Sequence, residues 1–213
     1  WKDELYLEYH QGTFTSQGAI KNNNRRTEAQ LATTEKLASI AWLLDGSYPG
    51  NELEKCWKSA LTLQFHDILP GSSITPVIRD ALAAYKQVRQ ELMFLQENAL
   101  ARIAAGVDTS GAKGTPLLVF NPLSWERDDV VTVAVPLPPY GARLFDDQGR
   151  EVATFCSGGE PAPGGGRRPA DLTFVARNVP PLGYRMYDLV AEPAAAGAGR
   201  VSGGVAPAGA AQA

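Results

Sequence analysis

The 213-residue chain is poor in the residues that stabilise small extracellular or metal-bound scaffolds. It has only two cysteines, Cys56 and Cys156, and only two histidines, His10 and His66. Two cysteines so far apart form neither a disulfide framework nor a cysteine-based zinc motif, and they suit a reducing compartment. The fold must therefore depend on a hydrophobic core.

The chain also lacks an excess of positive charge and any long apolar run. Its formal net charge of −3 argues against a nucleic-acid-binding surface. No apolar stretch approaches the roughly 20 residues that cross a bilayer as a helix, so we expect no membrane association. With 44% hydrophobic and 20% charged residues, the chain can bury one or two cores.

Apolar residues recur every three or four positions in three segments of residues 25–107, the spacing of amphipathic helices. The first segment ends at Asp45-Gly46, the second runs from about Asn51 to Asp67, and the third is the longest. Short loops join them, which predicts a three-helix bundle. The predicted core faces comprise Leu37, Ile40, Ala41 and Leu44, then Leu53, Cys56, Trp57, Ala60 and Leu61, and finally Val77, Ala81, Ala84, Val88, Leu92, Leu95, Ala99 and Ile103. Core positions rather than sugar-binding platforms are also predicted for the aromatic residues Trp42, Trp57, Tyr85 and Phe94.

After a Gly-rich linker at residues 108–115, the apolar period changes to two, which indicates β-strands. Strands are predicted at residues 117–120, 130–135, 143–145, 151–155, 172–177 and 184–190, with a hairpin loop at 146–149. Short strands at this spacing predict a β-sandwich over residues 116–192. Residues 193–213, almost all Ala, Gly, Pro and Val, are expected to be disordered. The predicted fold class is thus α+β and multidomain, a three-helix bundle followed by an antiparallel β-sandwich.

One histidine lies beside a carboxylate at a corner of the predicted bundle. Pro70-Gly71 ends the second helix, and Thr75-Pro76 begins the third, so His66 and Asp67 are predicted in the last turn of the second helix. From spacing alone, His66 is either a residue that interacts with the helix dipole or a metal ligand. A single His-Asp pair does not decide between these interpretations.

Residues 1–24 contain a second charged group, formed by Asp3, Glu4, Glu8 and His10. The segment begins with an apolar and polar alternation and ends in turn-forming residues, which predicts a short strand followed by a loop. Such a charged group is commonly a solvated face. The alternative is that it forms part of a site.

Two strings resemble signatures of the class II α-mannosidases, glycoside hydrolase family 38. The first is Gln-Phe-His-Asp-Ile-Leu-Pro-Gly-Ser-Ser-Ile at 64–74, whose Leu-Pro-Gly-Ser-Ser form resembles the cytosolic and bacterial branch. The second is Glu-Leu-Tyr-Leu-Glu-Tyr-His-Gln-Gly-Thr-Phe-Thr-Ser at 4–16, with Gln11 and Phe14 where arginine and tyrosine are common. Residues 117–125 and 179–184 also resemble the β region of this family. The resemblance covers residues 1 to about 190.

The resemblance implies a cytoplasmic, zinc-dependent, retaining α-mannosidase that acts on α-mannoside glycans. It makes His66 a ligand of the Zn²⁺ ion and Asp67 a substrate-binding residue of the sugar pocket. It makes Glu4 the general acid/base, with Asp3 and Glu8 as alternatives. Residues 1–24 then form the C-terminal edge of the catalytic domain.

On the same resemblance, the nucleophilic aspartate and the other zinc ligands lie outside this chain. The chain opens at Trp1 without an initiator methionine, and we expect it to be an inactive fragment of a longer enzyme. A homo-oligomer formed through other domains is compatible with this interpretation. Two other functions are compatible with the residues alone: a non-catalytic carbohydrate-binding or assembly module, and a structural helical adaptor in which His66 caps a helix.

Overall fold

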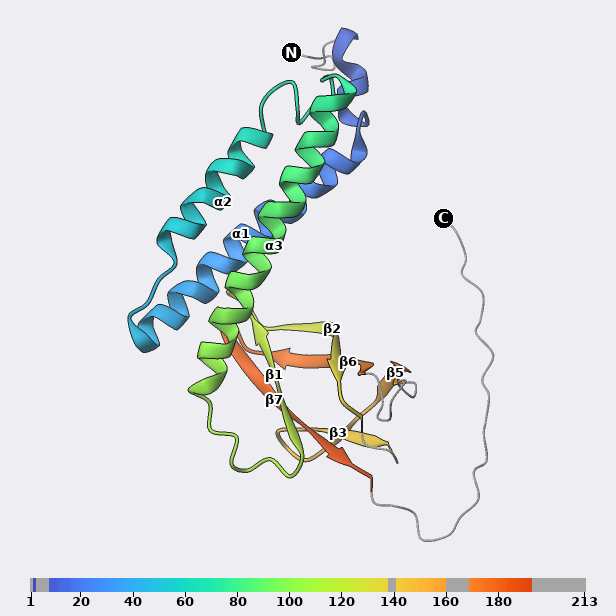
Figure 1. Cartoon of the computed structure of the whole chain (residues 1–213). Coiled ribbons are helices and arrows are strands. Elements are labelled where there is room, and N and C mark those ends of the chain that lie inside the picture. Colours follow the sequence, from blue (N-terminus) through green and yellow to red (C-terminus); the bar gives the residue numbers. More distant parts are fainter. Residues whose placement is uncertain (1, 3–7, 138–140, 160–168, 193–213) are drawn as a thin grey trace, which may run out of the picture. The chain divides into compact units, whose positions relative to one another are not determined.

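The structure is a computed structural model that describes residues 2, 8–137, 141–159 and 169–192 (Figure 1). The chain divides into a helical unit, residues 1–110 and 122–124, and a β unit, residues 111–121 and 125–213. The tail predicted to be disordered, residues 193–213, lies outside the described residues. Among the described helices, none combines the length and the apolar character needed to cross a membrane.

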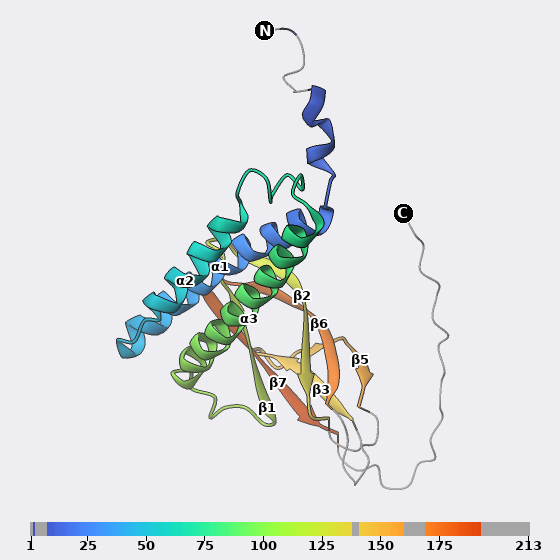
Figure 2. The same ribbon diagram turned by 45° about the horizontal axis from the view of Figure 1, so that its top comes forward.

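The helical unit contains the 3₁₀ helix η1 (Glu8–Phe14) and the helices α1 (Gly18–Asp45), α2 (Gly50–Leu63) and α3 (Thr75–Ala105). Figures 1 and 2 both show α2 and α3 lying beside α1, and α1 makes its most extensive contacts with α3. Gly46 ends α1 in the left-handed conformation, with φ 77°, and its N–H donates to the Trp42 carbonyl at 2.7 Å. Pro76 lies in the first turn of α3, where a missing N–H costs nothing.

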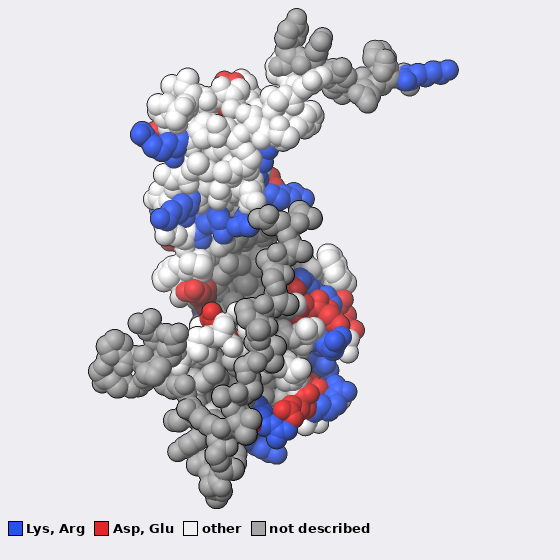
Figure 3. All heavy atoms as spheres, turned by 90° about the vertical axis from the view of Figure 1, so that its right-hand side faces the viewer, with Lys and Arg blue, Asp and Glu red and all other residues white. Residues whose placement is uncertain are grey.

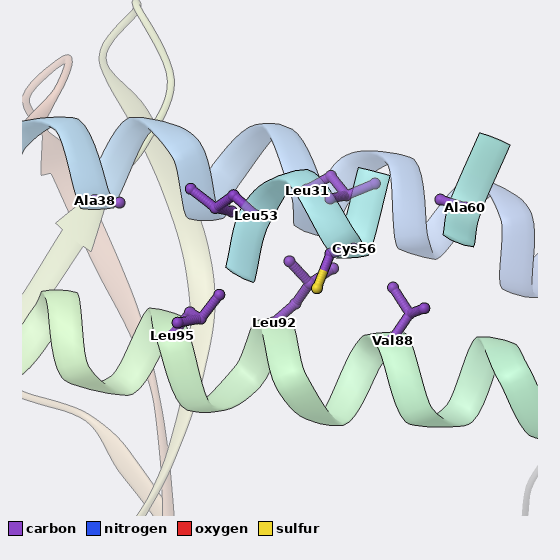
Figure 4. Close-up of a cluster of buried hydrophobic side chains, with 8 residues drawn as sticks. All are labelled: Leu31, Ala38, Leu53, Cys56, Ala60, Val88, Leu92 and Leu95. Carbon is purple, nitrogen blue, oxygen red and sulfur yellow. The ribbon is translucent and has the colours of Figure 1, made fainter. Parts of the chain in front are cut away.

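Buried side chains from all three helices meet in one core cluster (Figure 4). Its members are Leu31, Ala38, Leu53, Cys56, Ala60, Val88, Leu92 and Leu95. A second cluster fills the end of the bundle near the α2–α3 connection and comprises Ile20, Leu63, Ile78, Ala81 and Tyr85. The predicted core faces of α2 and α3 are therefore largely confirmed.

Several predicted core residues are nevertheless exposed. Trp42 and Phe94 are 48% and 58% exposed, so the aromatic prediction holds for Tyr85 and in part for Trp57, whose indole N–H donates to Glu35 Oε1 at 2.8 Å. Surface positions are also taken by the predicted core residues Leu44, Leu61 and Val77. In α3 the buried stripe starts one residue later than predicted, because bulky Ile78 and Tyr85 occupy the contact in place of Val77 and Ala84.

Two boundaries predicted from the sequence are wrong. Where a strand and loop were predicted before residue 25, the structure has η1 and the first turns of α1, because Ile20 and Asn24 are buried in the helical unit. Helix α2 ends at Leu63 rather than at Asp67. The N–H groups of Gln64 and Phe65 donate to the carbonyls three residues earlier, at 3.2 Å each, which tightens the chain into a turn.

The β unit consists of two antiparallel sheets with strand orders β1-β7-β3-β4 and β2-β6-β5. The strands are β1 (Thr115–Asn121), β2 (Arg127–Val135), β3 (Ala142–Asp146), β4 (Glu151–Val152), β5 (Thr154–Gly158), β6 (Ala170–Val179) and β7 (Gly183–Ala191). The predicted strand at 151–155 is two strands, because the chain crosses from one sheet to the other at Ala153. Side chains of both sheets share one core, which includes Leu144, Leu172, Phe174 and Tyr187. The predicted class of a helical bundle followed by antiparallel sheets is confirmed.

Candidate active-site corner

His66 and Asp67 lie in the connection between α2 and α3, here called turn 64–74. Their side chains are 79% and 59% exposed, and His66 Nε2 is 3.7 Å from Asp67 Oδ2. The Phe65 ring lies against the imidazole, with 4.2 Å between ring centroids. Both polar side chains are therefore accessible to a ligand.

The backbone of turn 64–74 is fixed by its own hydrogen bonds. The Phe65 carbonyl accepts from the N–H groups of Ile68 and Leu69 at 2.8 and 3.0 Å. The Asp67 carbonyl accepts from the Ser73 N–H at 3.0 Å and from the Ser73 hydroxyl at 2.6 Å. Because these bonds involve main-chain atoms of the turn, the side chains of His66 and Asp67 stay available.

Lys21 ties the start of α1 to this turn. Its ammonium lies 2.6 Å from the Ser16 carbonyl oxygen, 3.1 Å from that of Leu69 and 3.2 Å from that of Pro70. Three donors thus meet three acceptors, the full capacity of a lysine ammonium. Residue 16, at the end of one signature string, is held beside residues 69 and 70 of the other.

Gly71 permits the same close approach on the other side of the contact. Its φ is +81°, and an added Cβ would lie 2.8 Å from Gln17 Cβ and 2.9 Å from the Ser16 carbonyl oxygen. Real Cβ atoms do not come so close, so any larger residue at position 71 would push the two segments apart.

A buried polar network fixes the point where α2 becomes the turn. Tyr85, fully buried, directs its hydroxyl at Asn24 Oδ1 at 3.1 Å and at the Leu63 carbonyl at 3.4 Å. Gln64 Nε2 donates to Asn24 Oδ1 at 3.2 Å and to Glu28 Oε1 at 2.8 Å. Burial, and secondarily the charge of Glu28, raises the pKa of Tyr85 to about 12, which keeps the phenol a neutral donor.

The structure describes only part of the predicted site. His66 and Asp67 are neighbours on the turn, whereas Asp3 and Glu4 lie outside the described residues. Glu8 is the first residue of η1, and its side chain is not among those described. The predictions for these carboxylates therefore remain predictions.

The donor atoms at the corner suit zinc, which binds imidazole nitrogen and carboxylate oxygen. His66 and Asp67 supply one of each, both exposed. Within the described residues, no group of three His, Cys, Asp or Glu side chains could hold a metal ion. A zinc centre here therefore requires ligands from beyond those residues.

Sequence reasoning missed Lys21 and Asn24 as residues that support the corner. Asn24 had one detectable signal, because it stands four residues after Ile20, at a position where an amphipathic helix places a buried side chain. Lys21 had none, because its acceptors are 48 and 49 residues away on turn 64–74.

We predict that Lys21→Met loosens the corner, because two turn carbonyls and that of Ser16 lose their shared donor. The free energy of unfolding should fall by about 1–3 kcal/mol, and amide hydrogen exchange at residues 66–73 should accelerate. Thermal unfolding and exchange of the 213-residue chain measure both effects. Lys36→Met, on the exposed face of α1, is the matched control. Equal melting temperatures and equal exchange in the two variants would refute the role given to Lys21.

The sequence and its fold were compared with known proteins. Residues 8–103 match the family model described as the Alpha mannosidase middle domain. Alpha-mannosidase 2C1 of Mus musculus is 37% identical over 146 residues, which are 68% of this chain and 14% of that protein. Its counterpart in Homo sapiens is 36% identical over 138 residues, 64% of this chain and 13% of that protein. The chain belongs to the class II α-mannosidases, glycoside hydrolase family 38.

Two solved structures share the fold of this α-mannosidase segment. An alpha-mannosidase from Enterococcus faecalis V583 superimposes with a TM-score of 0.69 at 23% identity, covering 89% of this chain and 25% of that one. A glycosyl hydrolase family 38 protein from Enterococcus faecalis gives 0.70 at 21% identity, covering 89% and 26%. At such low identity the likeness shows the fold alone. The chain spans about one seventh of the length of its curated relatives.

Proposed function

We propose that this chain is the middle part of a zinc-dependent, retaining α-mannosidase that hydrolyses terminal α-mannosyl residues of glycans in the cytoplasm. The observation that carries the proposal is the corner, where exposed His66 and Asp67 stand on a turn fixed by hydrogen bonds. Membership of the α-mannosidase family supports the substrate class. The Leu-Pro-Gly-Ser-Ser form of the turn supports the cytoplasmic location.

In this proposal His66 binds the zinc ion through its imidazole, together with ligands from outside this chain. Asp67 accepts a hydrogen bond from a sugar hydroxyl or orients a neighbouring ligand. When bound, zinc acts as a Lewis acid that holds sugar hydroxyls. The chain's own contribution is a preorganised turn, because the bonds from Ser73 and Lys21 fix the main chain that carries both residues.

The acid/base role belongs to the segment before η1. Glu4 protonates the leaving glycosidic oxygen and then removes a proton from water, with Asp3 and Glu8 as alternatives. In retaining enzymes this carboxyl lies about 5–5.5 Å from a nucleophilic carboxylate, which we place outside this chain. The contacts of Lys21 and Gly71 with Ser16 support a single site, because they hold the end of this segment at turn 64–74.

We predict that the purified 213-residue chain does not hydrolyse a nitrophenyl α-mannoside, even with added zinc, because it lacks the nucleophile. The full-length enzyme should hydrolyse it and should lose activity to a chelator. Chromogenic assays of both proteins against a blank purification measure this. Turnover by the chain that disappears in a His66→Ala version would contradict the placement of the nucleophile. Chelator-resistant activity of the full-length enzyme would contradict the zinc assignment.

A further inference from the structure

The β unit contains a cavity of about 430 Å³ lined by residues from both of its sheets. We call it the arginine pocket, because Arg150 of the β3–β4 hairpin, Arg177 of β6 and Arg185 of β7 line it. Its volume falls within the roughly 300–1,000 Å³ typical of small-molecule sites. No residue of the proposed mannosidase site lies in it.

Each arginine of the pocket has a carboxylate partner. Arg150 Nη2 lies 2.8 Å from Asp146 Oδ2, Arg177 Nη1 lies 3.2 Å from Asp128 Oδ2, and Arg185 Nε lies 3.4 Å from Asp147 Oδ2. Glu151, which also lines the pocket, pairs with an arginine outside it, Arg143. Figure 3 shows the same balance more widely, with basic and acidic side chains intermixed on the visible face of the β unit. An anion would therefore find no unpaired cluster of positive charge here.

The paired guanidinium groups still offer hydrogen-bond donors. A guanidinium carries five N–H groups, and Arg177 uses one nitrogen, Nη1, for Asp128. Arg185 is held in place by its bond to Asp147 and by an N–H donated from Nη1 to the Arg177 carbonyl at 3.2 Å. Charge pairing thus orients donors in the pocket without using all of them.

Tyr187 adds a second kind of group. It is 2% exposed, and its hydroxyl oxygen accepts the Arg177 N–H at 3.2 Å, which leaves the O–H free to donate. Burial raises the pKa of this phenol, which keeps it protonated. Carboxylate oxygens of Asp146 and the side-chain amide of Asn178 supply acceptors nearby. Donors and acceptors therefore alternate around one cavity.

The remaining wall is apolar and small, formed by Val152, Ala153 and Val175. Such a surface suits the C–H face of a sugar ring, whereas alternating donors and acceptors suit its neighbouring hydroxyls, each of which both donates and accepts. We propose that the arginine pocket is a non-catalytic binding site for a neutral pyranose unit of a glycan. The site rests on the geometry of the β unit, and only the choice of an α-mannoside as first ligand rests on the proposed function.

The test is an NMR titration of amide signals of the 213-residue chain with methyl α-mannopyranoside, methyl α-glucopyranoside and, separately, inorganic phosphate. We expect a pyranose to bind with a dissociation constant of about 1–10 mM, about −3 to −4 kcal/mol. The shifts should be confined to residues 146–153, 175–178 and 185–187. Binding of either sugar supports the pocket, and binding of the mannoside also supports the shared specificity.

Two variants and one control locate the site. Ala153→Phe fills the cavity without removing a hydrogen bond, and Arg177→Ala removes a largely exposed donor while leaving its main-chain bonds. Each should weaken sugar binding about tenfold or more, one lost hydrogen-bonded contact being worth this much. Arg127→Ala removes an arginine that pairs with Asp129 and does not line the pocket, so it should leave the affinity within about twofold of wild type.

Three results would overturn the site. These are no shifts with any pyranose at about 50 mM, well above a millimolar dissociation constant, sugar-induced shifts outside the pocket, and phosphate shifting the pocket signals more strongly than sugar does. Binding is measured here without turnover. Failure of the pocket is therefore distinguishable from failure of the proposed function, which only mannosidase assays of the full-length enzyme address.

Discussion

Replacing His66 by alanine in the full-length enzyme should remove the bound zinc and reduce activity at least about 100-fold, while the helical unit stays folded. Loss of a residue that merely orients a zinc ligand typically costs 10–100-fold, so loss of a ligand should cost more. The stability cost should be small, about 1 kcal/mol or less, because the side chain is 79% exposed and contacts mainly Phe65 and Asp67.

The experiment compares bound zinc by elemental analysis, turnover and melting temperature in the same preparations. Glu54→Ala is the control, because Glu54 is an exposed titratable residue of α2 that pairs with Lys58 and lies outside the turn. It should keep its zinc and its activity. Full zinc occupancy and near-normal turnover of His66→Ala, with a lowered melting temperature, would show instead that His66 only stabilises the corner.

The fold was predictable where local pattern and packing agree. In α3 the three- and four-residue spacing of Ala81, Val88, Leu92 and Leu95 marks the face that the bundle buries. Strand β6 likewise alternates exposed and buried residues over much of its length. In both cases one periodic stripe must be buried whatever the partner is, so the sequence alone specifies the element.

Prediction failed where the partner decides the outcome. The contact face of α1 includes buried Thr27 and Thr34 and leaves Trp42 half-exposed, so counting apolar residues pointed to the wrong part of the helix. The Ala153 crossover is invisible for a related reason, since the residues on both sides favour strands equally. Which sheet each strand joins depends on β3 and β6, which lie far from it in space.

The candidate site shows the same division. His66 and Asp67 were found because their string is contiguous, and their exposure on a fixed turn is compatible with the roles assigned to them. Lys21 and the close approach at Gly71 could not be found, because each depends on contact between segments about 50 residues apart. A motif thus identifies the groups that meet the ligand, and the tertiary structure identifies those that hold them.

In the full-length enzyme, Glu4→Gln should slow hydrolysis of mannosides with poor leaving groups by roughly 10²–10⁴-fold, the usual contribution of general acid catalysis. Glutamine has nearly the size of glutamate, but it cannot give a proton to the departing oxygen. Activated aryl mannosides need no such proton, so formation of their glycosyl-enzyme should be much less affected. Water attack in the second step also loses its base, so the covalent intermediate should accumulate.

The measurement is the ratio of kcat/KM for an alkyl mannoside to that for a dinitrophenyl mannoside, in wild type and variant. Added azide should speed turnover of the aryl substrate by Glu4→Gln, because azide attacks the glycosyl-enzyme without needing a base. Asp3→Asn and Glu8→Gln, from the same segment, are the matched comparisons and should show neither the changed ratio nor the azide effect. Equal losses on both substrates for Glu4→Gln would move the acid/base to Asp3 or Glu8, or away from this segment.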